Sequence, residues 1–239
     1  PEKVPDLPPG HVRVFDLNSG EPKWIFHTFP QSGEFGNESW LDDSWAVTGA
    51  TNIWTMISAD AELGYVYLPV GNPGNDFYGG QRLGDNLFGT SLVALNASTG
   101  DRQRHYQILH HELWDYDPPA APTMVDIYLD GRQVKAVAMV TKQAFVYVFD
   151  RLTGEPIWPI EESPVPPSTV PGERASLTQP FPTRPPAFDL QGINDATLID
   201  FTPDLRQEAL QIIKEFDYGG LYTPPSLKGT VTIPGWPGG

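Results

Sequence analysis

The sequence predicts an all-β protein, and three observations support this prediction. Short runs of Val, Ile, Tyr, Phe, Trp and Thr recur along the chain, and such side chains favour the pleated, half-buried surface of a sheet. Most runs end at a turn signal, as in antiparallel sheets. A turn motif also recurs at intervals of 36 to 54 residues, which is typical of small sheets that follow one another along a chain.

Nine segments carry the strand pattern, because apolar or β-branched residues alternate or cluster in them. They are Val12–Phe15, Trp24–Phe29, Trp54–Ala59, Tyr65–Val70, Ser91–Leu95, His105–Leu109, Thr123–Leu129, Val134–Val140 and Ala144–Phe149. The glycine-rich and polar residues between them predict turns and loops.

Two segments near the C-terminus depart from this pattern. Residues 203–216 predict a short helix, since Thr202 suits the N-cap and Pro203 suits the first helical position. Its apolar side chains fall on one face: Leu205, Ala209, Ile212, Ile213 and Phe216. Residues 161–187 are rich in proline and lack periodicity, so they predict a long ordered surface loop, with a flexible linker as the alternative.

Composition excludes several classes of function. Thirty acidic and 15 basic residues give a net charge of −15, which argues against binding to nucleic acid or to an anionic membrane surface. No apolar run approaches the ~18 residues of a membrane-spanning helix. The chain of 239 residues contains no cysteine, so disulfides, zinc–thiolate sites and thiol nucleophiles are excluded.

A turn motif repeats along the chain. Residues 14–24 and 148–158 both contain a strand end, an Asp, two further residues, a Ser-Gly or Thr-Gly pair, and a Trp four residues after the Gly. Residues 93–100 repeat it with Asn96 for Asp and with Arg104 at the Trp position, and residues 58–64 are a degenerate copy. The Asp or Asn would cap the turn, the Gly would adopt a positive φ, and the Trp would pack between neighbouring sheets. Coincidental hairpins are the alternative, but the spacing favours about one four-stranded propeller blade per copy.

This repeat resembles the tryptophan-docking motif of the PQQ-dependent (quinoprotein) alcohol and glucose dehydrogenases, which are eight-bladed β-propellers that bind pyrroloquinoline quinone (PQQ). The resemblance runs through most of the chain, and its other segments are Gly71–Gly74, Gly84–Leu87, His110–Asp117, Thr141–Lys142 and Tyr222–Ser226. The last of these, with Gly229 and Thr230, is most similar to the membrane-type glucose dehydrogenase branch. The family's catalytic unit is about twice as long. The resemblance therefore implies that residues 1–239 are a single partial propeller domain of about four blades.

Two residues are candidates for catalysis. Asp115 lies beside apolar residues that would raise its pKa, as a general base requires. The resemblance implies that it is the catalytic base, whereas the residues alone favour a turn cap, as they do for Asp117. Lys142 stands at the start of a predicted strand, and the family places Arg or Lys here in contact with the quinone oxygens. The alternative for Lys142 is a solvated lysine at a strand end.

Three residues are candidates for binding the cofactors. The resemblance implies that Trp54 is the stacking floor under PQQ, and a buried strand residue is the alternative. Asn72 matches the asparagine ligand of a calcium ion held beside PQQ, and a turn asparagine is the alternative. The family's glutamate ligand should lie just upstream of Val12; between Pro1 and Gly10 the only glutamate is Glu2, and Pro5 occupies about the expected place. His111 is expected to face the active site; adjacent strand residues point to opposite faces, which disfavours a transition-metal site shared with His110.

Together, these matches imply PQQ- and calcium-dependent oxidation of a sugar or alcohol hydroxyl, with a quinone or cytochrome as electron acceptor, in the bacterial periplasm. A non-catalytic propeller scaffold is the alternative, and a carbohydrate-binding β module ranks below it. A scaffold has no reason to retain all four matched polar and aromatic site residues. Lys142 is typical of the glucose branch and Asn72 of the alcohol branch, so the substrate stays open. The chain has neither an initiator Met nor a signal sequence and ends in Gly-Pro-rich residues, so we expect the remainder of the propeller to accompany it.

Overall fold

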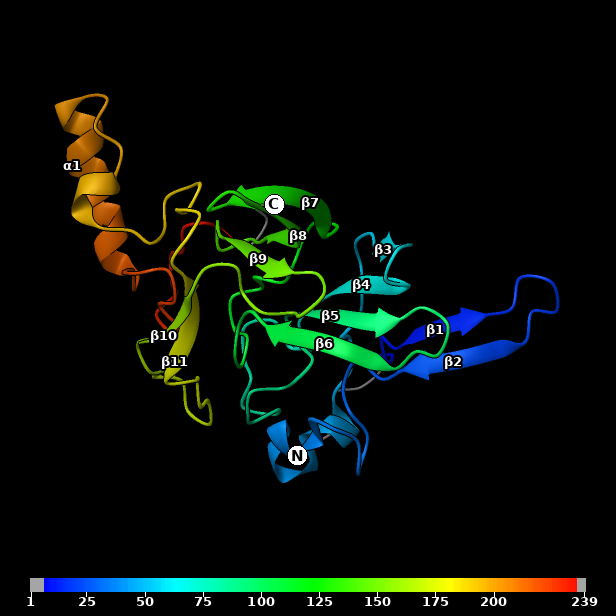
Figure 1. Ribbon diagram of the computed structural model, residues 1–239. Coiled ribbons are helices and arrows are strands. Elements are labelled where there is room, and N and C mark those ends of the chain that lie inside the picture. The colour runs from blue at the N-terminus through cyan, green and yellow to red at the C-terminus, as the bar shows by residue number, and fades with distance from the viewer. Residues whose placement is uncertain (1–6, 236–239) are drawn as a thin grey trace.

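The computed structural model describes residues 7–235 and contains four antiparallel sheets (Figure 1). The first pairs β1 (Val12–Phe15) with β2 (Pro22–Phe26). The second has the order β3 (Ser58–Asp60), β4 (Tyr65–Val70), β5 (Ser91–Asn96) and β6 (Arg102–Gln107). The third contains β7 (Thr123–Leu129), β8 (Arg132–Val140) and β9 (Val146–Asp150). The fourth pairs β10 (Ile160–Pro164) with β11 (Thr178–Pro182).

The all-β prediction is confirmed, and each of the nine predicted segments overlaps a strand. Two differences affect the site. The predicted strand Trp54–Ala59 begins only at Ser58, so Trp54 lies in a loop. Lys142 lies in the turn between β8 and β9 and not at a strand start.

The proline-rich segment 161–187 is not only a loop, because it contains most of the β10–β11 hairpin. Pro180 and Pro182 pair with Glu162 and Ile160 across this hairpin. In a two-stranded sheet both strands are edges, and an edge tolerates the missing N–H of proline. The hairpin therefore forms without the alternating apolar pattern on which the prediction depends.

The predicted helix is present as α1 (Pro203–Ile212), followed by a short 3-10 turn, Ile213–Glu215. Thr202 caps it as predicted, since its hydroxyl oxygen accepts a hydrogen bond from the Leu205 N–H at 3.2 Å. The helix projects away from the sheets (Figure 1), and its apolar face is largely exposed apart from the buried Ile213. Within residues 7–235, the helices fall short of the length and apolarity of a bilayer span.

The repeated turns have the predicted chemistry. In each copy a side-chain oxygen of Asp16, Asp60, Asn96 or Asp150 accepts hydrogen bonds from the backbone N–H groups two and three residues later. The glycine four residues after it has a φ between 67° and 78° in every copy. L-residues avoid this left-handed region, so glycine is required there. The degenerate copy at residues 58–64 therefore shares the turn chemistry, but it lies in the same sheet as the copy at residues 93–100, so the expectation of one blade per copy is wrong for it.

Two of the turn units pack a side chain on the glycine of a turn in the next sheet. Trp24 lies so close to Gly100 that a Cβ there would be 2.6 Å from the indole ring, and the Trp24 Nε1–H donates to the Ala97 carbonyl at 3.2 Å. Arg104 takes the equivalent place on Gly154, where a Cβ would lie 2.7 Å from the Arg104 side chain. These contacts link the β1–β2 sheet to the second sheet, and the second sheet to the third.

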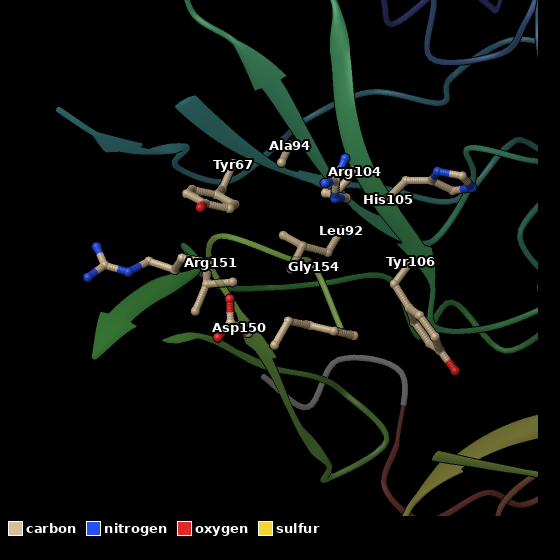
Figure 2. Close-up of a pocket in the computed structure, with 11 residues that line it drawn as sticks. Tyr67, Leu92, Ala94, Arg104, His105, Tyr106, Asp150, Arg151 and Gly154 are labelled. Atoms are coloured by element: carbon tan, nitrogen blue, oxygen red, sulfur yellow. The ribbon is translucent and has the colours of Figure 1, made fainter. Parts of the chain in front are cut away.

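The second and third sheets also share an apolar seam (Figure 2). Its lining residues include Tyr67, Leu92 and Ala94 from the second sheet and Val137 and Phe149 from the third. The cavity left between them is about 20 Å³, far below the ~300–1,000 Å³ of a ligand pocket. The seam is therefore part of the core and not a binding site.

The strand order places the repeated turns at one end of the sheets and the longer connections at the other end. Successive antiparallel strands are joined at alternate ends, so the repeated turns gather at one end. The longer connections 27–57, 71–90 and 108–122, and the short turn 141–145, lie at the other end. All five candidate site residues are in these four segments.

Replacement of Gly100 tests the link between sheets. Gly100→Ala would introduce a residue at φ +78° and push its Cβ into Trp24. Gly20→Ala is the matched control, because Gly20 has φ +73° but nothing within 4 Å of the added Cβ. We expect both variants to lose the ~1–2 kcal/mol of a left-handed alanine. Overpacking should cost Gly100→Ala a further ~1–3 kcal/mol, and equal losses in denaturant unfolding of the intact protein would contradict the link.

His105 should give part of the pH dependence of stability. Its ring packs against Phe35 and Phe88, and burial, with the charge of Arg102, lowers the pKa of His105 to about 4. The unfolded chain binds a proton near pH 6.5 and the folded chain only near pH 4, so the free energy of unfolding should fall as the pH decreases between these values. His105→Phe should reduce this slope in denaturant titrations. His11, whose pKa burial also lowers to about 4, should still contribute to the slope in this variant. A slope that His105→Phe leaves unchanged would refute the assignment of this pH dependence to His105.

Candidate active site

Three of the predicted site residues meet at the loop end of the sheets. The Lys142 Nζ donates a hydrogen bond to the Asp115 carbonyl at 3.0 Å and lies 3.5 Å from Asp115 Oδ2. It also lies 5.3 Å from the centre of the Trp54 ring. The loops after β2 and β6 and the β8–β9 turn therefore bring an aromatic ring, a carboxylate and an ammonium group together.

Asp117 completes this cluster, and sequence reasoning missed its role there. The structure replaces its interpretation as a turn cap. One carboxylate oxygen, Oδ1, accepts from Lys142 Nζ at 2.7 Å, and the other, Oδ2, accepts from the Trp54 indole N–H. The Asp117 side chain is 6% exposed. Its spacing of two residues from Asp115 was the only sequence signal for this role.

Burial and charge set the proton affinities of the cluster. Burial raises the pKa of Asp115; Lys142 opposes this rise, and the negative charges of Asp117 and Asp76 add to it. Burial alone would lower the pKa of Lys142, but hydrogen bonding and charge from Asp117 and Asp115 outweigh burial and raise it. Lys142 therefore stays an ammonium, while Asp115 has an increased affinity for a proton.

The Trp54 ring is accessible, so the alternative interpretation of Trp54 as a buried strand residue is wrong. It is 52% exposed, although its indole N–H is fixed by Asp117. Gly71 allows the neighbouring loop to come close, because a Cβ on Gly71 would lie 3.3 Å from the Trp54 ring. The ring thus has a fixed orientation and an accessible surface.

Asn72 lies beside this cluster and contacts a second buried acid. Its Nδ2 donates to Asp76 Oδ1 at 3.1 Å and to Glu112 Oε2 at 3.2 Å. The other oxygen of Glu112 accepts from the backbone N–H groups of Trp114 and Tyr116 at 2.7 and 3.0 Å. Glu112 therefore shapes the turn that carries Asp115, a role that the sequence analysis did not predict.

The His111 side chain contacts groups outside the cluster of Lys142, Asp115 and Asp117. Its Nδ1 lies 2.7 Å from the Gly84 carbonyl oxygen and its Nε2 2.6 Å from Glu173 Oε1, so both ring nitrogens are engaged away from Lys142. His110 instead contacts Glu162 at 3.0 Å. Over residues 7–235, no three His, Asp or Glu side chains are arranged to hold a metal ion.

The assembled cluster has the parts that oxidation of a hydroxyl requires. A carboxylate of raised proton affinity suits the removal of a hydroxyl proton. A fixed ammonium suits the stabilisation of a developing oxyanion. An accessible indole suits the stacking of a planar ring.

Comparisons with known proteins point to the same chemistry. The family model described as "PQQ: Glucose/ethanol/alcohol dehydrogenase, beta-propeller domain" matches residues 2–239. The quinoprotein glucose dehydrogenase of Escherichia coli (strain K12) is 35% identical over 231 residues, which cover 95% of this chain and 28% of that protein. The quinate/shikimate dehydrogenase (quinone) of Acinetobacter baylyi is 33% identical over 98% of this chain and 29% of that protein.

A solved structure is similar as well. The quinohemoprotein alcohol dehydrogenase of Pseudomonas putida HK5 matches with a TM-score of 0.58 and 30% identity, over 64% of this chain and 25% of that one. The chain thus spans less than a third of the length of these relatives. The propeller prediction is confirmed, with sheets that do not close into a ring in residues 7–235. The chain belongs to the β-propeller family of PQQ-dependent glucose, ethanol and alcohol dehydrogenases.

Proposed function

We propose that the protein oxidises a hydroxyl group of a sugar or alcohol with PQQ as cofactor. The observation that carries this proposal is the cluster in which Lys142 contacts Asp115 and Asp117 beside the accessible Trp54 ring. Relatives are named for glucose, quinate or shikimate, and glycerol, and each of these compounds carries hydroxyl groups on carbon. That shared chemistry is the substrate class proposed here.

Asp115 is the proposed base. It takes the hydroxyl proton as the carbon–hydrogen bond of the substrate breaks, because its carboxylate has a raised pKa and remains partly accessible, with 18% of the side chain exposed. Lys142 keeps its charge next to this carboxylate, and Asp117 holds Lys142 in place. The base and the ammonium therefore keep a fixed separation.

The residues present fit PQQ. Trp54 offers a half-exposed ring whose orientation Asp117 fixes, and Lys142 offers a cation close to that ring. A flat ring system with anionic groups matches this pair. When bound, PQQ supplies the acceptor for the hydride.

The described residues do not by themselves fit a calcium ion. Calcium takes about six to eight oxygen ligands, whereas Asn72 offers one amide oxygen and residues 7–235 contain no cluster of three acidic or histidine side chains around it. Glu2 lies outside the described residues. The role of Asn72 as a calcium ligand remains a prediction, as does cofactor contact by His111, and no step here depends on either.

The proposal extends to the partners by analogy with the family. We propose a quinone or a cytochrome as electron acceptor, a periplasmic location, and the remainder of the propeller as the structural partner. The non-catalytic scaffold has less support, because the relatives reported above are named as dehydrogenases.

Asp115→Asn tests the base directly. The variant keeps the size of the side chain but removes the proton acceptor, so turnover with an artificial dye acceptor should fall ~10²–10⁴-fold. PQQ affinity should change far less. Asp101→Asn is the control, since Asp101 is exposed in a turn at the opposite end of the sheets. Near-normal turnover of Asp115→Asn would remove this residue from the mechanism.

Lys142→Met tests the electrostatic coupling. Since Lys142 lowers the proton affinity of Asp115, its removal should raise the pKa of Asp115 further, and the basic form should appear at higher pH. The acidic limb of the pH profile of kcat/KM should therefore move upward. Lys135→Met is the matched control, because Lys135 is half exposed and pairs with Glu62. Identical profiles for both variants would show that Lys142 does not act on the base.

A further inference from the structure

A buried contact between Glu173 and His111 lies behind the turn that carries Asp115. The two side chains are 2% and 1% exposed, and their closest atoms are 2.6 Å apart. The His111 Nδ1 faces the Gly84 carbonyl oxygen at 2.7 Å, and because a carbonyl only accepts, Nδ1 carries a hydrogen. Glu173 comes from the 165–177 loop of the proline-rich hairpin, a segment that no part of the proposed mechanism uses.

The Glu173 carboxylate is surrounded by hydrogen-bonding groups. Burial alone would raise the pKa of Glu173, but hydrogen bonding and charge from His111, with the backbone N–H groups of Gly79 and Arg174, outweigh burial and lower it. These contacts therefore favour the ionised form of the Glu173 carboxyl.

Glu173 joins three segments through its two oxygens. Oε1 contacts His111 Nε2 and accepts from the Arg174 N–H at 2.7 Å, and Oε2 accepts from the Gly79 N–H. Gly79 permits this approach, because a Cβ there would lie 2.3 Å from the His111 Nε2. The loops 71–90, 108–122 and 165–177 thus converge on one carboxylate.

The hairpin makes a second buried contact with the same loop, next to His111. The Gln179 side chain is fully buried; its Oε1 accepts from the His110 N–H at 2.8 Å and its Nε2 donates to the His110 carbonyl at 2.7 Å. The next residues after His111 are Glu112 and the turn that it shapes around Asp115. A displacement of His111 would therefore also displace this turn and, with it, Asp115.

We propose that Glu173 is a positioning residue, which through His111 and Gly79 fixes the turn of Asp115 relative to the loop of Asn72. The inference rests on the proposed function, because the position of Asp115 governs turnover only if Asp115 is the base. The proline-rich hairpin is then a brace of the active site, although its residues do not touch the cluster of Lys142 and Asp115.

Glu173→Gln in the intact protein is the test. A glutamine has one oxygen in place of two, so one oxygen cannot keep both the contact with His111 Nε2 and the hydrogen bond from the Gly79 N–H. Because a misplacement of about 1 Å can cost 10²-fold in rate, we expect kcat per folded, PQQ-loaded molecule to fall about tenfold or more, with KM nearly unchanged. Nitrogen NMR of the His111 ring should show a changed signal for Nε2, the nitrogen that faces Glu173.

Two further variants keep the result interpretable. Glu162→Gln is the matched control, since Glu162 makes a similar contact with His110 from the same hairpin but is about half exposed; it should leave kcat unchanged. Glu173→Asp keeps the charge on a shorter side chain and should give an intermediate kcat, and it serves as the test if Glu173→Gln does not fold.

The outcomes distinguish a failure of the positioning role of Glu173 from a failure of the proposed function. An unchanged kcat in Glu173→Gln, with an altered His111 ring and an inactive Asp115→Asn, would overturn the positioning role and leave the proposed function intact. An unchanged kcat in Glu173→Asp would overturn that role where Glu173→Gln does not fold. A fully active Asp115→Asn would remove both proposals. A selective loss of kcat in Glu173→Gln, absent from Glu162→Gln, would establish the brace.

Discussion

Packing of a side chain on the glycine of a turn in the next sheet joins the first three sheets to one another. Trp24 on Gly100 and Arg104 on Gly154 use the same geometry with different chemistry: an indole face in one case, an aliphatic stem and a guanidinium in the other. Each contact requires a glycine at positive φ, because a Cβ would occupy the space of the partner. With the repeated turns joined in this way, the loops at the opposite end have a rigid base.

That rigid base explains how residues far apart in the sequence form one site. Trp54 and Asp117 are 63 residues apart, and Lys142 and Asp117 are 25 apart, yet one buried carboxylate fixes both the ring and the ammonium. Asp115 stays more accessible than Asp117 and has a raised proton affinity. Two acids two residues apart thus have different roles, one structural and one suited to proton transfer, because their burial and partners differ.

Local chemistry made the fold predictable and left part of the site unpredictable. The Asp or Asn cap and the glycine act within five residues, so the sequence alone predicts the turns, and strand composition predicts nine of the eleven described strands. The β10–β11 hairpin was missed because its prolines conceal an edge-strand pairing. Asp117, Glu112 and Glu173 were missed because their roles depend on burial and on partners from distant loops, which a single sequence does not show. The roles of Trp54, Asp115 and Lys142 were predicted only through the family resemblance, because the residues alone also allow an ordinary structural explanation for each.

The central claim is that the loop end of the sheets binds PQQ against Trp54 and Lys142. A crystal structure of the intact protein with PQQ bound tests it most directly. We expect a quinone stacked on the Trp54 ring, with its oxygens in contact with the Lys142 ammonium and Asp115 facing the open side. A quinone bound elsewhere, out of contact with both the Trp54 ring and the Lys142 ammonium, would contradict this mode of binding.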